Sequence, residues 1–286
     1  MESTVRGTRR ALLVAATAAA AVLGLVVTPQ AFAGEAGPTS GTTAVDEQDT
    51  TGNHTMGSQI RKHEPAQKDQ EQAPISAAGA EASVEGIDVA SYQGNVDWAG
   101  QWGAGKRFAY VKATEGTGYT NPYFAQQYNG SYNIGMIRGA YHFALPGSSS
   151  GATQANYFVD HGGGWSRDGK TLPGVADLEY NPYGATCYGL SQASMAAWIR
   201  DFANTYRSRT GRDAVFYTST SWWSQCVGTA QSFGSTNPLW VARYSSTVGT
   251  LPSGWGYYTF WQYSSTPIDQ DRFNGAIDRL QVLATG

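Results

Sequence analysis

The stretch Val175-Ala176-Asp177-Leu178-Glu179-Tyr180 ends a short apolar run and carries two carboxylates two positions apart. Successive side chains of a β-strand point to opposite faces, so a strand here would turn Asp177 and Glu179 the same way. Their Cα atoms would lie roughly 6.5–7 Å apart, and the two charges would repel each other. The pKa values of such a pair tend to split, so that one carboxyl is a proton donor and the other an anion. Cleavage of a glycosidic bond uses these two groups together. The alternative is that both carboxylates simply end a strand and face water.

Two segments precede the part of the chain that is rich in aromatic residues. Residues 1–33 combine early arginines with an apolar stretch and end in Ala31-Phe32-Ala33, the pattern of a cleaved export signal. An uncleaved membrane anchor is disfavoured, because the stretch is at the short limit for a spanning helix. Residues 34–83 contain no Phe, Tyr or Trp, so they cannot bury enough apolar surface to offset chain entropy. We expect a secreted protein with a signal peptide over 1–33, a disordered leader or pro-segment over 34–83, and a folded domain over 84–286.

The charge balance of the expected domain excludes several classes of partner. Residues 84–286 carry 13 basic and 13 acidic side chains. A neutral domain lacks the basic stripe of a nucleic-acid-binding protein and the cationic surface that draws proteins to acidic membranes. We therefore expect no nucleic-acid partner and no membrane partner once the signal is removed. Separately from the charge balance, we expect a monomer. The many Trp and Tyr residues suit stacking on sugar rings as well as core packing.

Cys187 and Cys226 are the only cysteines, and an even pair in an exported chain predicts a disulfide. The bridge would close a loop of about 39 residues, worth on the order of 4 kcal/mol in the chain-entropy model. None of the four histidines has metal-ligand spacing to another histidine or to a cysteine. The sequence therefore predicts no metal and no other cofactor.

Short β-like runs alternate with helical stretches from residue 84 onward. The runs lie at 86–89, 108–112, 137–143, up to Glu179, and 214–217, and the helical stretches between them lie at 97–102, 122–133, 151–160 and 191–206. After Ser219 the helical signal fades, and 239–242 and 258–263 have the pattern of strands. Strands that alternate with helices indicate a parallel sheet. We expect an α/β barrel of about five β/α units followed by three strands, with function at the carboxyl ends of the strands.

Acidic side chains fall at or just after the ends of the predicted strands: Asp88, Glu115, the Asp177 and Glu179 pair, and Asp269 with Asp271, which follow the last strand. Each alone could be a capping or loop carboxylate. Because they come from distant parts of the chain and share one predicted edge, we expect them to meet at one site.

Six ordered blocks carry a resemblance to a known family: Gly86–Gly94, Phe108–Gly116, Gly139–Phe143, Asp177–Glu179, Phe260–Tyr263 and Asp269–Phe273. They resemble glycoside hydrolase family 25, the Chalaropsis-type and Streptomyces-type lysozymes or N,O-diacetylmuramidases. The resemblance covers essentially all of residues 84–286. It implies a flattened, irregular TIM-like barrel, and hydrolysis of the β-1,4 bond between N-acetylmuramic acid and N-acetylglucosamine in bacterial peptidoglycan.

The resemblance also implies site residues. The catalytic acids would be Glu179, Asp177, Asp88 and Asp269. Asp271 is the alternative to Asp269, because the block has Asp-x-Asp where many members have Asp-x-Asn. The substrate-binding positions would be Glu115, Tyr110, Tyr141, Trp240, Gln262 and Asp271, with packing as the alternative for the aromatic ones.

The mechanism implied by the resemblance retains the anomeric configuration. Glu179 would protonate the leaving oxygen, and Asp177 would either attack C1 or hold the acetamido group while the substrate's own N-acetyl oxygen attacks. Other functions stay open from the sequence. They are a chitinase-like hydrolase, a non-catalytic peptidoglycan-binding module, and a structural or adhesive secreted protein.

Overall fold

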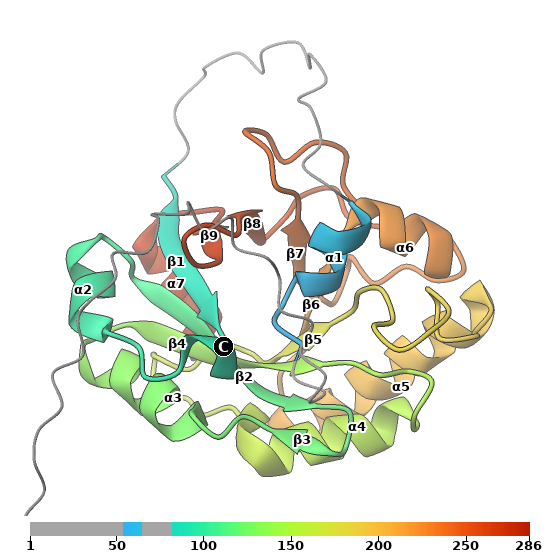
Figure 1. Ribbon diagram of the computed structural model, residues 1–286, viewed down its shortest axis with the longest axis horizontal. Helices are drawn as coiled ribbons and strands as arrows, with labels where there is room; N and C mark the ends of the chain where they lie inside the picture. The colour runs from blue at the N-terminus through green and yellow to red at the C-terminus, as the bar shows by residue number, and fades with distance from the viewer. Residues whose placement is uncertain (1–53, 65–81) are drawn as a thin grey trace, which may run out of the picture. The chain divides into compact units, whose positions relative to one another are not determined.

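Within residues 54–64 and 82–286, which the computed structural model describes, eight strands close into a barrel (Figure 1). Seven of them run parallel in the order β1 Val84–Val89, β2 Phe108–Glu115, β4 Ile137–Phe143, β5 Val175–Asp177, β6 Val215–Thr218, β7 Leu239–Ala242 and β8 Phe260–Ser264. The eighth, β9 Gln270–Phe273, pairs antiparallel with both β8 and β1 and closes the ring. The two-residue strand β3 Tyr119–Thr120 lies outside the ring, antiparallel to β2. The expected α/β barrel is confirmed.

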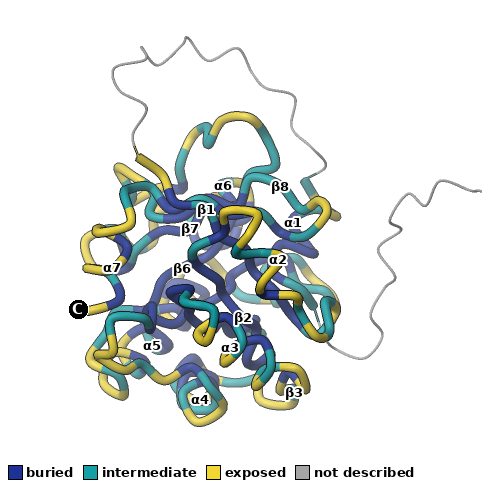
Figure 2. The backbone as a smooth tube through the Cα atoms, turned by 90° about the vertical axis from the view of Figure 1, so that its left-hand side faces the viewer, coloured by how far each residue is buried: buried dark blue, intermediate teal, exposed yellow. Residues whose placement is uncertain are grey.

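Helices cover the outside of the barrel (Figure 2). They are α2 Trp98–Gly103, α3 Phe124–Asn133, α4 Gly151–Phe158, α5 Gln192–Thr210, α6 Thr220–Cys226 and α7 Ile277–Thr285, with the short turns η1 Ser91–Gln93 and η2 Val159–Gly163. Helix α5 begins where the Ser191 side chain accepts a hydrogen bond from the backbone of Ser194 and ends at Gly211, whose φ of 74° favours glycine. Helix α6 lies where we expected the helical signal to fade. Its Trp222 and Trp223 are fully buried, so tertiary packing stabilises this seven-residue helix.

The barrel interior is filled by aromatic side chains. The rings of Tyr110 and Trp240 lie 4.9 Å apart, and those of Phe108 and Phe260 lie 5.3 Å apart. All four residues are fully buried. The interior is therefore a packed core, and a site must lie at one of its ends.

Part of the predicted leader is ordered. The predicted export signal, 1–33, and residues 34–53 and 65–81 of the predicted leader lie outside the described residues. Residues 54–64, hereafter the leader segment, contain helix α1 Ser58–His63, shown in blue over the barrel in Figure 1. We expected no structure here because the segment has no aromatic residue. Met56 and Ile60 are nevertheless at most 1% exposed, because both side chains pack into the hydrophobic core of the barrel.

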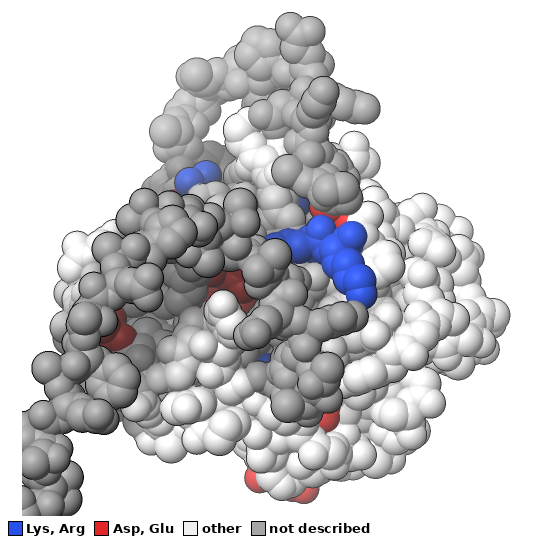
Figure 3. Space-filling model, in the orientation of Figure 1, with Lys and Arg blue, Asp and Glu red and all other residues white. Residues whose placement is uncertain are grey.

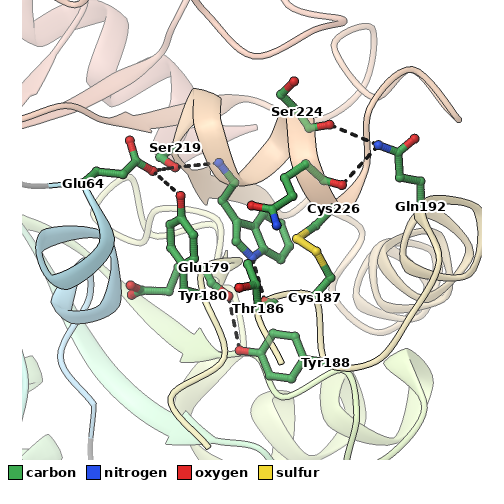
Figure 4. Close-up of a disulfide and its surroundings, with 12 residues drawn as sticks. Glu64, Glu179, Tyr180, Thr186, Cys187, Tyr188, Gln192, Ser219, Ser224 and Cys226 are labelled. Atoms are coloured by element: carbon green, nitrogen blue, oxygen red, sulfur yellow. Dashed lines mark hydrogen bonds between the residues drawn. A yellow bond between two sulfur atoms is a disulfide. The ribbon is translucent and has the colours of Figure 1, made fainter. Parts of the chain in front are cut away.

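The predicted disulfide is confirmed. Cys187 and Cys226, with Cα atoms 5.3 Å apart, join the loop after β5 to the end of α6 (Figure 4). The bridge closes a loop of 39 residues.

Removing this bridge should lower stability. Replacing both cysteines by Ala should reduce the free energy of unfolding by on the order of 4 kcal/mol, because the unfolded chain regains the entropy of the opened loop. Urea titration of the two proteins without reductant measures the difference. An unchanged midpoint in the double variant would show that the bridge does not stabilise the fold. The same titration with reductant on the wild type is the matched control.

Candidate active site

Acids from distant parts of the chain meet at the carboxyl end of the parallel strands. Asp88 lies near the end of β1, Glu115 ends β2, and Asp177 ends β5 with Glu179 two residues beyond. Asp269 and Asp271 follow the strand predicted at 258–263, which is β8, but a further strand that we did not place, β9, begins between them. Asp269 immediately precedes β9, and Asp271 lies within it. Because β9 runs antiparallel to its neighbours, its beginning lies at the same end of the barrel as their carboxyl ends.

Asp177 and Glu179 form a buried carboxyl pair, each at most 1% exposed. Burial raises the pKa of Glu179 to about 7, although N–H groups that donate to it favour its anion. Burial, and next the neighbouring Glu179, raise the pKa of Asp177 well above its usual range. Apart from the neighbouring Glu179 carboxyl, no side chain or backbone group among the described residues donates to either oxygen of Asp177. One carboxyl of this pair is therefore suited to give a proton, and the other has free acceptor capacity.

A second acidic cluster consists of Asp88, Asp269 and Asp271. The Gln262 side-chain N–H donates to Asp88 Oδ2 at 2.7 Å. Burial, and next the charge of Asp269, raise the pKa values of both Asp88 and Asp271 well above their usual range. Like charges in one buried place favour protonated carboxyls, which can donate as well as accept hydrogen bonds.

Glu115 is a different kind of acid. Burial alone would raise its pKa, but the Lys112 ammonium, 2.6 Å away, and His54 outweigh burial and lower the pKa to about 2. The Tyr183 hydroxyl also donates to Glu115 Oε1 at 2.9 Å. Glu115 is thus a fixed anion and is unsuited to deliver a proton at neutral pH. The sequence signal for the Lys112 and Glu115 pair was a Lys within an otherwise apolar strand, three residues before an acid.

The three aromatic positions divide into two groups. Tyr141 accepts a hydrogen bond at its hydroxyl from the backbone of Met56 at 3.2 Å, so it lies at the site. Tyr110 donates its hydroxyl proton to the Pro173 carbonyl, and its ring packs on Trp240 in the barrel interior. Tyr110 and Trp240 therefore support the site from beneath, as packing residues. The sequence could not separate the two groups, because inward-pointing side chains of a strand follow the same alternation at the site and deeper in the barrel.

No group of three or more His, Cys, Asp and Glu side chains among the described residues could hold a metal ion. In the same part of the chain, no helix is long and apolar enough to cross a bilayer.

Comparison with known proteins identifies this arrangement. The family model of glycosyl hydrolases family 25 matches residues 87–272, about two thirds of the chain. The chain belongs to that family. Lysozyme M1 of Streptomyces globisporus is 43% identical over 98% of this chain and 96% of its own length. The N,O-diacetylmuramidase of a Chalaropsis species is 52% identical over 71% of this chain and all of its own. A solved muramidase from Acremonium alcalophilum, 54% identical, covers 71% of this chain and 99% of its own with a TM-score of 0.69.

This family 25 chain is a glycoside hydrolase of the muramidase, or lysozyme, class. Its site is filled by the leader segment. The backbone N–H groups of Gly57, Gln59 and Ile60 donate to the two oxygens of Glu179 at 2.7, 2.8 and 2.9 Å. A cavity of about 360 Å³, lined by Leu239 and Phe273 among others, lies toward the opposite end of the barrel, away from these acids. That end does not carry function in folds of this type.

The leader segment also pairs with other acids of the glycoside hydrolase site. The backbone and ring N–H groups of His54 reach Glu115 at 2.9 and 2.8 Å. Arg61 donates to Asp269 Oδ1 at 3.1 Å. Glu64 accepts from the Tyr180 and Ser219 hydroxyls, as Figure 4 shows. Sequence reasoning missed these partners, because the leader has the composition of a chain without structure.

Proposed function

We propose that this chain is a secreted muramidase that hydrolyses the β-1,4 bond between N-acetylmuramic acid and N-acetylglucosamine in bacterial peptidoglycan, with retention of configuration. The observation that carries the proposal is the buried Asp177 and Glu179 pair, in which both carboxyls have raised pKa values and the backbone leaves the oxygens of Asp177 free to accept from a ligand. The names of the curated relatives supply the substrate class.

In the proposed mechanism Glu179 is the general acid. It donates its proton to the glycosidic oxygen as the bond to C1 breaks. The proposed role of Asp177 is to accept the acetamido N–H of the muramic acid residue and orient its carbonyl oxygen toward C1. This fits a buried carboxyl whose oxygens, apart from the Glu179 carboxyl, receive no donor from the described chain. The acetamido oxygen bonds to C1 as the protonated leaving oxygen departs, which gives a cyclic intermediate. Glu179, now a carboxylate, takes a proton from water, which attacks C1 from the face that the leaving group left and breaks the bond to the acetamido oxygen, so configuration is retained.

The remaining acids have supporting roles in this proposal. Asp88 and Asp269 polarise the reaction centre and position the attacking water, with Asp271 adjoining them. Gln262 holds Asp88, while Glu115 and Tyr141 contact the sugar in the open groove. We further propose that residues 1–33 direct export, that 34–83 are a leader, and that 84–286 are the catalytic domain.

The direct test is to identify the bond that is cut. Purified protein freed of its leader is incubated with bacterial peptidoglycan, and the fragments are reduced with borohydride and analysed by mass spectrometry. Reduced muramic acid ends are the expected result. Reduced glucosamine ends would show that the opposite bond is cut, and release from chitin instead of cell walls would favour a chitinase. Binding to walls without any new reducing ends would overturn the proposal in favour of a binding module.

The pH dependence of the rate should have an alkaline limb set by Glu179. A general acid works only while protonated, so kcat/KM should fall about tenfold per pH unit above its pKa. That pKa is about 7 with the leader segment in place. Loss of the segment removes three donors, which raises the pKa, and admits water, which lowers it, so we expect the limb near this value. Initial rates on peptidoglycan across pH measure it, and a rate that still rises two pH units higher would exclude Glu179 as the acid.

A further inference from the structure

We propose that the leader segment, residues 54–64, is an autoinhibitory pro-segment that occupies the catalytic site until it is released from the barrel. This inference rests on the proposed muramidase function of the same site. Residues 65–81 connect the segment to β1, so its departure from the domain requires that this connection be broken or that the segment swing out on it.

The segment binds the groups that the substrate needs. Glu179, Glu115 and Asp269 each pair with residues of the segment, and the Tyr141 hydroxyl accepts from Met56. The Lys112 ammonium donates to the His54 carbonyl as well as to Glu115. A sugar chain cannot lie against Glu179 while three backbone N–H groups of the segment occupy both of its oxygens.

The contacts also work against the protonated form of Glu179, because they offset part of the rise in its pKa that burial causes. A general acid must carry a proton, whereas an acceptor of three N–H hydrogen bonds is favoured as the anion. The segment therefore blocks the reaction by excluding the substrate, while Glu179 keeps a pKa of about 7 beneath it. Arg61 adds a positive charge beside the same acids, and it donates to Asp269. Figure 3 shows the largest group of basic side chains on this face where α1 lies.

The fit is close at Gly57. Its φ is +74°, and a Cβ there would lie 2.1 Å from Tyr244 Oη, 2.5 Å from Tyr217 Oη and 2.6 Å from Gln262 Oε1. These three groups come from the barrel and are held together, since both hydroxyls lie 2.7 Å from Gln262 Oε1. Residue 57 is outside the catalytic domain, so a side chain there should expel the segment without changing the catalytic residues.

Comparison with relatives shows that a similar barrel occurs in a solved chain that lacks most of the leader. The solved muramidase from Acremonium alcalophilum aligns over 99% of its length with 71% of this chain, which is the share taken by residues 84–286. That solved chain therefore has no counterpart of most of the leader, whereas lysozyme M1 of Streptomyces globisporus aligns over 98% of this chain, leader included. The segment's tight association is then better explained by a role in control than by a role in folding.

The test uses the exported chain from Gly34 onward, with a recognition sequence for a site-specific protease introduced within residues 65–81. Initial rates on peptidoglycan are measured before the cut and after it, once gel filtration has removed the leader. An effective concentration of roughly 1 mM against a dissociation constant of roughly 10 µM would leave about one uncut molecule in a hundred open. We therefore expect the cut to raise the rate on the order of a hundredfold.

Two variants of the uncut chain locate the inhibition. Gly57→Val should bring the uncut rate close to that of the leader-free protein, because the segment no longer fits. Lys62→Ala is the matched control, since Lys62 belongs to the same helix but is exposed. It should stay as slow as the parent. A synthetic peptide of residues 54–64, at roughly 1 mM, should inhibit the leader-free enzyme, whereas the Gly57→Val peptide should not.

The outcomes separate the two proposals. Equal rates before and after the cut would overturn autoinhibition and leave the muramidase function standing. Activation by the cut without any effect of Gly57→Val would place inhibition elsewhere in the leader and overturn the assignment to residues 54–64. Leader-free protein that is folded by circular dichroism yet releases no fragments would overturn the proposed function itself.

Discussion

Replacing Glu179 by Gln is expected to lower kcat on peptidoglycan by about 10²–10⁴-fold in the leader-free protein, the usual contribution of a general acid. The amide has nearly the shape of the carboxyl but cannot give a proton to the leaving oxygen. Glu179 is buried and its pKa is raised to about 7, so the wild type keeps a protonated fraction at neutral pH. Release of reduced muramic acid ends measures the loss.

The control for this variant is Glu85→Gln. Glu85 lies on β1 of the same barrel, and its carboxylate pairs with Arg272 and Lys106 on the face of the strand opposite to Asp88. The pKa of Asp271 is raised mainly by burial, and the charge of Glu85 is the smallest of its causes. Replacing Glu85 should leave kcat unchanged, although it removes the same charge. Glu179→Gln protein with turnover near that of the wild type would remove Glu179 from the mechanism.

Replacing Asp177 by Asn should lower kcat on the order of 10²–10³-fold, the usual cost of losing one stabilising group at the reaction centre. The fold should not suffer, because, apart from the Glu179 carboxyl, no side chain or backbone group among the described residues donates to the Asp177 oxygens. The variant even loses a buried acid whose pKa is raised by its surroundings, so its unfolding midpoint should equal or exceed that of the wild type. Asp278→Asn, at an exposed position of α7, is the control.

The same residue distinguishes two mechanisms. If the substrate's acetamido oxygen attacks C1, glycan strands that lack the acetyl group on the muramic acid residue should not be cleaved. No covalent glycosyl adduct on Asp177 should then appear in the mass spectrum during turnover. An adduct on Asp177 would instead establish direct attack by its carboxylate and would overturn the orienting role.

Local patterns were enough to predict much of this protein. Apolar side chains recur with one period in strands and another in helices, and each period can be read from a few neighbouring residues. The alternation of the two kinds of segment along the chain then indicated the barrel. Cys187 and Cys226 were predicted to pair because the sequence offers no other cysteine. The acids of the site were also predicted from the sequence. They follow predicted parallel strands, and the carboxyl ends of such strands lie at one end of the barrel.

Tertiary structure decided what depends on contacts between distant residues. The antiparallel course of β9 brings Asp269 and Asp271 to the site from the strand's beginning. Tyr110 and Trp240 pack in the barrel interior, beneath the acids. The alternation of side chains along a strand cannot show this, because every second residue points into the barrel whether it lies at the site or deeper in the core. Above all, the leader segment has no apolar pattern of its own. Its order comes from hydrogen bonds to Glu179, more than a hundred residues away, so only the folded barrel could reveal it.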